Sequence, residues 1–258
     1  MSENISTKSL AVFVNNESVT FLTKTIQQEE VFYSEPYTIK LPNLAKNVTY
    51  NELENSIKSN LALLLYYNKI IVCYQSTPAT IVPSIYFDAK DKAATFLNSD
   101  KQIEANAIAL QKVDAYFVYN NFNPLNTVFK NLPNFKNAIY THTGKFLIDE
   151  CKVDREKIQV FVRLINQKLE LCIYKNGIFT LYTIYDIIGD EDVVYYILNT
   201  IQQLELDHQQ VEVAFEGGIN ATHIAMEYLP RYVHKVTYNE TYELQGPKYL
   251  LYKIFECE

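Results

Sequence analysis

The sequence predicts an α/β protein with two lobes, each containing a mixed five-stranded sheet flanked by helices. Two observations predict this fold class. Each half of the 258-residue chain offers three short extended stretches, then a helix, then a further strand-like stretch. In the first half that last stretch, Ile70–Tyr74, is apolar without alternation, which is typical of a strand buried on both faces of a parallel sheet.

The first half begins with a hairpin pattern. Asn15, Asn16 and Glu17 separate two apolar stretches, and they indicate a turn because Asn tolerates positive φ. Thr49 and Glu52 stand three residues apart, as in a capping box, and precede apolar residues at helical spacing. The strands expected here are Leu10–Val14, Ser18–Leu22, Val31–Leu41, Ile70–Tyr74, Ala93–Leu97, Val113–Tyr119 and Phe135–Tyr140. Further helices are expected over Phe122–Leu132 and Gly144–Asp154.

The second half repeats the pattern more clearly. A tight turn is expected at Asn166–Lys168, and Asn176-Gly177 is one of the strongest short signals for a hairpin. A helix should begin among Asp190, Glu191 and Asp192, because negative charge stabilises a helix N-terminus. Strands are expected over Ile158–Ile165, Leu169–Tyr174, Ile178–Ile184, Val211–Phe215 and Tyr232–Tyr238, with a second helix over Ala221–Pro230.

The two halves share this pattern without evident sequence identity. We expect an N-terminal lobe over residues 1–154, with an inserted segment at about 78–110, and a C-terminal lobe over residues 155–258. Three antiparallel strands followed by alternating helices and strands imply a mixed sheet with helices on its faces.

Composition excludes several classes of protein. The net charge of −7 and the absence of a Lys/Arg cluster argue against nucleic-acid binding. No apolar stretch reaches the roughly 18–20 residues that span a bilayer, and the N-terminus lacks an apolar signal region, so we expect a cytoplasmic protein. The four cysteines form no CxxC pair and are expected to be reduced thiols.

Several stretches carry a resemblance to a known family. They are Val82–Phe87, Tyr174–Phe179, Asp192–Leu198, Gln203–Asp207, Gly217–Ile219 and Tyr228–Tyr232. Together they resemble a family of uncharacterised bacterial proteins with a domain of unknown function. The resemblance implies a duplicated ribonuclease H-like fold of the actin-like ATPase type, without an assigned activity. More distantly, the chain is similar to the ATPase-like scaffolds of pilus and secretion assembly.

The nucleotide site of that superfamily gives a test. Its active members carry an Asp and a Gly in the first hairpin of each lobe, where they handle metal and phosphate. Here the corresponding positions hold Asn15 and Asn16 in the first hairpin, and Asn166 and Lys168 in the second. Asn binds a cation weakly and Lys168 could meet a phosphate, but polar turn residues occur in any hairpin. With only six glycines in the chain, we expect a pseudo-ATPase without catalytic residues or a metal site.

One fragment still favours nucleotide binding. Gly217 and Gly218 follow a strand and resemble the superfamily's adenosine-contacting loop, although such a pair is also a good turn before a helix. If ATP and Mg²⁺ bind at all, we expect this pair, with Asn15, Asn16, Asn166 and Lys168, to contact them.

Other candidate residues have simpler explanations. Asp190, Glu191 and Asp192 could bind a metal, but a charged helix N-terminus explains them. The four histidines lack the HxxxH spacing of a metal site. His142 could act as a base, but the sequence has no motif such as GxSxG that would supply a nucleophile for it. The 21 tyrosines could form a recognition surface, or simply occupy strands with one hydrated end.

Two functions of different classes remain. The first is a non-catalytic scaffold that binds an unknown protein partner, or a second copy of itself as a homodimer. The second is a divergent ATP-binding protein or weak ATPase that uses the cleft between lobes. A nuclease of the ribonuclease H type is set aside, because Leu10–Val14 and Ile158–Ile165 contain no carboxylates.

Overall fold

The fold is described from a computed structural model. It describes residues 6–41, 50–60, 63, 65–75, 78–88, 96–97, 105–121, 123–216, 219–238 and 247–256. The chain divides into two compact units. The first comprises Met1–Ala109, Ala115–Thr143 and Leu250–Glu258, and the second comprises Leu110–Asp114 and Gly144–Tyr249. A lobe boundary at residues 154 and 155 stays a prediction.

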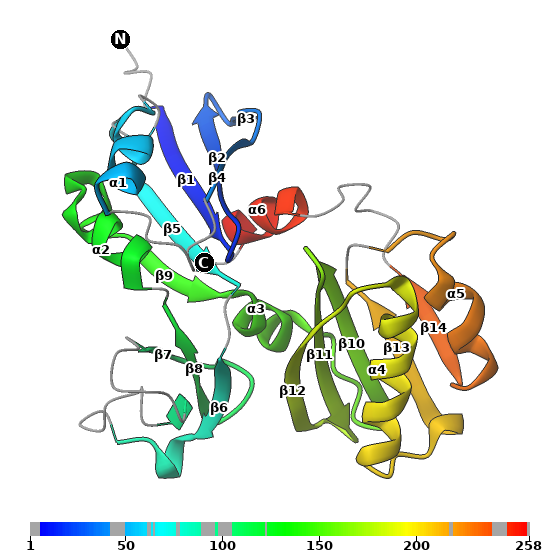
Figure 1. The fold of residues 1–258 in the computed structure, drawn as a ribbon. Coiled ribbons are helices and arrows are strands. Elements are labelled where there is room, and N and C mark those ends of the chain that lie inside the picture. The colour runs from blue at the N-terminus through cyan, green and yellow to red at the C-terminus, as the bar shows by residue number, and fades with distance from the viewer. Residues whose placement is uncertain are drawn as a thin grey trace. The chain divides into compact units, whose positions relative to one another are not determined.

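The first unit is built around a mixed sheet with the strand order β3-β2-β1-β5-β9 (Figure 1). Strands β1, β5 and β9 are parallel, and β2 pairs antiparallel with β1 on one side and with β3 and β4 on the other. The strands are β1 (Thr7–Val14), β2 (Ser18–Gln27), β3 (Glu30–Tyr33), β4 (Tyr37–Lys40), β5 (Lys69–Tyr74) and β9 (Ile139–His142). The helices described in this part of the chain are α1 (Tyr50–Lys58) and α2 (Asn123–Asn131).

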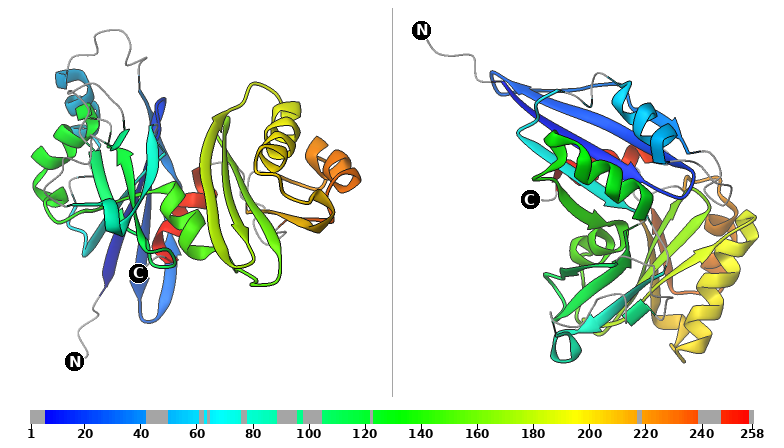
Figure 2. Two further views of the ribbon diagram at one scale, coloured as in Figure 1. Left: turned by 90° about the horizontal axis from the view of Figure 1, so that it is seen from below. Right: turned by 60° about the vertical axis from the view of Figure 1, so that its left-hand side comes forward.

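The second unit has a five-stranded sheet with the order β12-β11-β10-β13-β14. Its strands are β10 (Ile158–Ile165), β11 (Lys168–Lys175), β12 (Ile178–Asp186), β13 (Val211–Phe215) and β14 (Lys235–Tyr238). Figure 2 shows α4 (Asp190–Gln203) and α5 (Ile224–Tyr228) covering one face of this sheet. Alternate residues of β10 and β11, beginning with Ile158 and Leu169, pack with Val193 and Ile197 of α4 into one core.

The two sheets have the same strand order and the same senses of pairing. In each, the first strand pairs antiparallel with the second and parallel with the strand that follows the first helix. In each, the last strand is also parallel to its neighbour. The duplicated α/β architecture predicted from the sequence is therefore confirmed.

Three further strands of the first unit form a separate small sheet with the order β6-β8-β7. They are β6 (Ala79–Pro83), β7 (Ala105–Ala109) and β8 (Ala115–Asn120). Val82, Leu97 and Val118 form its buried core. The strand predicted over Ala93–Leu97 is wrong in its described part, since Phe96 and Leu97 lie in a 3-10 turn, and residues 93–95 lie outside the described residues.

Other differences from the expected elements have local causes. Pro36, which has no N–H to donate, separates the stretch Val31–Leu41 into β3 and β4. The strand expected over Phe135–Tyr140 begins later, as β9 at Ile139. A 3-10 turn over Pro133–Phe135 precedes it, and the Phe135 ring stacks on Phe129. In the sequence, the boundaries between the two units fall within α3 (Thr143–Glu150) and α6 (Pro247–Glu256), and α6 has no counterpart among the predicted elements.

Among the described residues, no helix has the length and apolar character needed to cross a bilayer.

The hairpin signal at Asn176-Gly177 is confirmed. Both residues have positive φ, +54° and +78°, and the turn closes on the pair Lys175 and Ile178. This is the backbone of a two-residue turn whose twist matches that of the flanking strands.

Replacing Gly177 by Ala should destabilise the protein. The new Cβ would lie 2.9 Å from Cγ of Arg155, at a backbone conformation that L residues rarely adopt. We expect a loss of about 1–2 kcal/mol in the free energy of unfolding, measured by urea denaturation. Gly189→Ala is the comparison, since Gly189 has an extended φ of −136° and its new Cβ would approach only the end of the flexible Glu191 side chain, at 3.0 Å, so the loss should be smaller. Equal effects of the two substitutions would contradict this account of the turn.

Candidate functional site

The first hairpin is held together by its own asparagine. Asn15 follows β1 and is buried, and its Oδ1 accepts hydrogen bonds from the backbone N–H of Glu17 at 2.8 Å and of Ser18 at 2.7 Å. The Ser18 hydroxyl donates to the same oxygen at 3.2 Å. The backbone N–H of Asn15 donates to the Ser18 carbonyl at 3.1 Å. The carboxamide of Asn15 therefore acts inside the turn, and Asn16 lies exposed at the tip.

A shallow depression of about 450 Å³ lies beside this hairpin. Asn16, Glu17 and Ser18 line it from the turn, and Thr38, Lys40 and Leu41 line it from β4 and its end. The Leu41 N–H donates to the Glu17 carbonyl at 2.7 Å, which ties the end of β4 to the turn. The depression places one ammonium group, that of Lys40, near the hairpin of the first unit.

The turn of the second hairpin consists of two non-glycine residues with positive φ. Asn166 and Gln167 have φ of +48° and +59°, and the turn closes on the pair Ile165 and Lys168. The Gln167 carbonyl accepts a hydrogen bond from the Ile187 N–H at 2.9 Å. The Lys168 ammonium forms an ion pair with Asp186, its cross-strand neighbour on β12. The cation that could have met a phosphate is thus paired within the sheet.

A buried ion pair lies at the base of the same hairpin. Arg163 of β10 and Glu170 of β11 are cross-strand neighbours, both are fully buried, and Nη1 lies 3.8 Å from Oε2. Burial disfavours the charge of Arg163, but the Glu170 carboxylate together with Tyr249, Glu216 and Glu150 more than offsets this effect, so the pKa of Arg163 is held above its usual value. Loss of either partner would leave a buried charge, which makes this pair a structural constraint on the hairpin.

Gly217 and Gly218 lie outside the described residues, but their neighbours are described. The strand β13 continues its ladder as far as Glu216, whose N–H donates to the Val162 carbonyl at 2.8 Å. After the pair, Asn220 Oδ1 accepts the Thr222 N–H at 3.0 Å, and His223 Nδ1 accepts the Ala225 N–H at 3.1 Å. The described residues after the pair therefore form a turn followed by a capped helix start.

The acidic residues Asp190, Glu191 and Asp192 begin α4. The Asp192 carboxylate accepts the N–H of Ile188 at 2.7 Å and of Gly189 at 3.2 Å, so it caps the helix. Asp190 Oδ1 lies 3.5 Å from Nε2 of His223. Within the described ranges, no three His, Cys, Asp or Glu side chains are grouped as metal ligands would be. The helix-terminus interpretation of this cluster agrees with these contacts.

His142 is buried rather than exposed at the surface. Its ring stacks on Phe117 with centroids 4.9 Å apart, and lies 5.1 Å from the ring of Tyr119. Burial raises the pKa of the neighbouring Tyr119 above its usual value. The sequence did not reveal this aromatic cluster, because β8 and β9 meet only through tertiary packing.

Three of the four cysteines lie within the described residues. Cys73, Cys151 and Cys172 are buried and take part in no disulfide there, and Cys257 lies outside the described residues. Burial raises the pKa of the Cys151 thiol, with Cys172 as a close neighbour. A buried thiol with a raised pKa is a poor nucleophile, so Cys151 offers no reactive centre.

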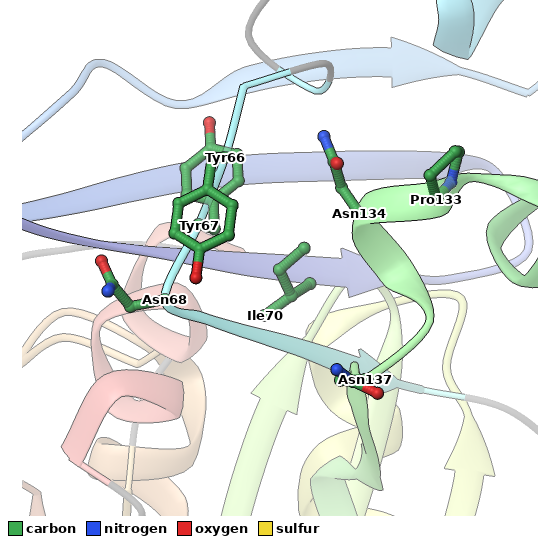
Figure 3. A pocket seen from close by; sticks show the side chains of 7 residues that line it. All are labelled: Tyr66, Tyr67, Asn68, Ile70, Pro133, Asn134 and Asn137. Atoms are coloured by element: carbon green, nitrogen blue, oxygen red, sulfur yellow. The ribbon is translucent and has the colours of Figure 1, made fainter.

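A second, smaller depression of about 190 Å³ lies at the other end of the first sheet (Figure 3). Tyr66, Tyr67 and Asn68 line it from the segment before β5, and Pro133, Asn134 and Asn137 line it from the segment before β9. Asn68 Oδ1 accepts the Lys8 N–H and Asn134 Nδ2 donates to the Leu65 carbonyl, each at 2.8 Å. Two of its three asparagines therefore fasten the surrounding chain.

Comparison with known proteins places the chain in a family. Residues 2–236 match the family described as Protein of unknown function (DUF3822). The chain belongs to this family. No similar sequence is found among functionally curated proteins.

Solved structures show the fold type. A protein from Bacteroides thetaiotaomicron VPI-5482, described as having an actin-like ATPase fold and unknown function, is 14% identical with a TM-score of 0.76. The match covers 97% of this chain and 96% of that one. The PilM-PilN type IV pilus biogenesis complex contains a chain that is 9% identical with a TM-score of 0.50, over 95% of this chain and 94% of that one. The chain therefore has the actin-like ATPase fold that the family resemblance implied.

Replacing Asn15 by Ala should weaken the first hairpin. Its Oδ1 satisfies two backbone N–H groups and one hydroxyl, and no other side chain in the described turn replaces it. We expect a loss of about 1–3 kcal/mol in the free energy of unfolding, from urea denaturation. Asn16→Ala, one residue along at the exposed tip, is the control and should change stability by less than about 0.5 kcal/mol. A neutral Asn15→Ala would show that the carboxamide has no structural role.

Proposed function

We propose that this chain is a non-catalytic, cytoplasmic scaffold of the actin-like type that binds a protein partner. The observation that carries the proposal is that backbone N–H groups of the first hairpin already donate hydrogen bonds to a side chain of the same turn. The N–H groups of Glu17 and Ser18 would be the donors for a phosphate at the first hairpin, and both are directed to Asn15 Oδ1.

The second hairpin supports the same conclusion. A phosphate-binding loop needs backbone N–H groups that a ligand can approach without a Cβ in the way. Here Asn166 and Gln167 carry side chains at positive φ, and Lys168 is neutralised by Asp186. Binding phosphate would break an existing ion pair and crowd against two side chains.

The similarity to a chain of the PilM-PilN complex supports the choice of a protein partner. That chain has a related fold and occurs in a pilus biogenesis complex with another protein. Fold similarity does not by itself transfer a function, so the partner of this chain is proposed only as a protein.

One observation favours the alternative, a divergent ATP-binding protein or weak ATPase. The depression at the first hairpin brings Lys40 and the hydroxyls of Ser18 and Thr38 together, and these groups could hold a phosphate. Such a site would have no help from Asn15, whose carboxamide is used inside the turn.

A calorimetric titration with ATP and Mg²⁺, supported by thermal shift, separates the two functions. The scaffold proposal predicts no saturable heat and no rise in melting temperature at millimolar nucleotide. Saturable binding that disappears in a Gly217→Val, Gly218→Val double variant or in Lys40→Ala would refute the proposal and favour ATP binding. Asn137→Ala, in the depression at the other end of the sheet, is the control for non-specific effects.

A further inference from the structure

Among the described strands, β3 lies at the edge of the first sheet (Figure 1). It pairs with β2 through Gln27 and Glu30, which close a two-residue turn. The closing pair of such a turn is hydrogen-bonded and the bonding then alternates, so Glu30 and Phe32 direct their backbone groups to β2. The bond from the Ser34 N–H to the Thr23 carbonyl, at 3.0 Å, fits this alternation. The N–H and C=O of Val31 consequently point away from the sheet.

The same edge exposes large apolar side chains. Val31 is 46% exposed, Phe32 52% and Tyr37 of β4 50%. Phe32 and Tyr37 lie on one face of the sheet, because they pair with Thr25 and Phe21 on β2. Exposed apolar residues on an open strand edge are uncommon in a monomeric protein, which usually protects such an edge with Lys or a bulge.

The second unit provides an internal comparison. Its edge strand β12 occupies the same position in the duplicated topology and has nine residues. Along β12, Ile178 is the one exposed large apolar residue, and it stands next to the turn. The exposed apolar edge is therefore a property of β3 and β4 and not a consequence of the architecture.

Charges around the edge indicate what could cover it. Glu29 and Glu30 precede the apolar residues and Glu35 follows them, while no Lys or Arg occurs from residue 28 to residue 39. A second copy of β3 would bring two such acidic sets together, on chains that each carry a net charge of −7. An extended segment with basic flanks would instead neutralise them.

We propose that β3 is a docking site for an extended segment of a partner protein, in which alternating apolar residues are flanked by Lys or Arg. The segment adds to the sheet as a further strand, with backbone hydrogen bonds to Val31 and apolar contacts to Phe32 and Tyr37. This inference rests on the proposed scaffold function and names the surface that performs it.

Fluorescence anisotropy with synthetic peptides tests the proposal. The probe is a fluorescein-labelled peptide of alternating Val and Thr with lysines at both ends. We expect saturable binding to the full-length protein that weakens as salt is raised. The same core with glutamate flanks should bind about tenfold more weakly or not at all. The lysine-flanked peptide with every core amide N-methylated should not bind, because its backbone cannot pair.

Variants locate the binding to β3. Val31→Pro removes the outward N–H without removing a bond to β2, and proline is tolerated at such edge positions. It should reduce affinity by about tenfold or more. Phe32→Thr, which keeps the backbone, should also weaken binding, whereas the matched change Ile178→Thr on β12 should leave it unaltered. Thermal unfolding of each variant checks that it is folded.

Three results would overturn the proposal. They are no binding of the lysine-flanked peptide at millimolar concentration, unchanged binding in both Val31→Pro and Phe32→Thr, or equal affinity for glutamate-flanked peptides. A dimer seen by sedimentation and abolished by Val31→Pro would replace the partner by a second copy of the chain. Each of these results leaves the nucleotide titration unaffected, so failure of the docking site and failure of the scaffold function are distinguishable.

Discussion

The central strand of each unit is paired on both sides, and this constraint determines where the hairpins lie. β1 pairs antiparallel with β2 and parallel with β5, and β10 has the same two kinds of neighbour in β11 and β13. Such strands are buried, and their register is specified by apolar residues on both faces. The turn that follows each central strand lies at the carboxyl end of the parallel strands. In open α/β sheets, this is the end at which ligands bind.

Within that constraint, the composition of the turns decides what they can do. The Asn15 carboxamide takes up the N–H groups that a phosphate would need, and Asp186 takes up the charge of Lys168. Arg163 and Glu170 then fix the base of the second turn through a buried ion pair. The actin-like framework is retained, while two backbone N–H groups of its first hairpin and the Lys168 ammonium of its second are engaged within the protein.

The sequence predicted those features that are determined locally. Asn176-Gly177 adopts its turn because both residues accept positive φ, and the acidic start of α4 follows from helix capping. The division of Val31–Leu41 into β3 and β4 at Pro36 was not predicted, since residues typical of strands occur on both sides of the proline. The helix α6 was not predicted either. The sequence located both hairpin turns correctly. It could not predict the contacts of the turn residues, because the pairing of Lys168 with Asp186 depends on the register of β11 and β12.

The central claim is that both hairpins are closed to phosphate by their own contacts. Two-dimensional amide NMR of the full chain during a titration with Mg·ATP tests it directly, because it reports on each turn separately. The account predicts that the amide signals of Ser18 in the first hairpin and of Asn166 and Gln167 in the second stay unmoved at millimolar nucleotide. Saturable shifts of these signals, with a common dissociation constant, would contradict it.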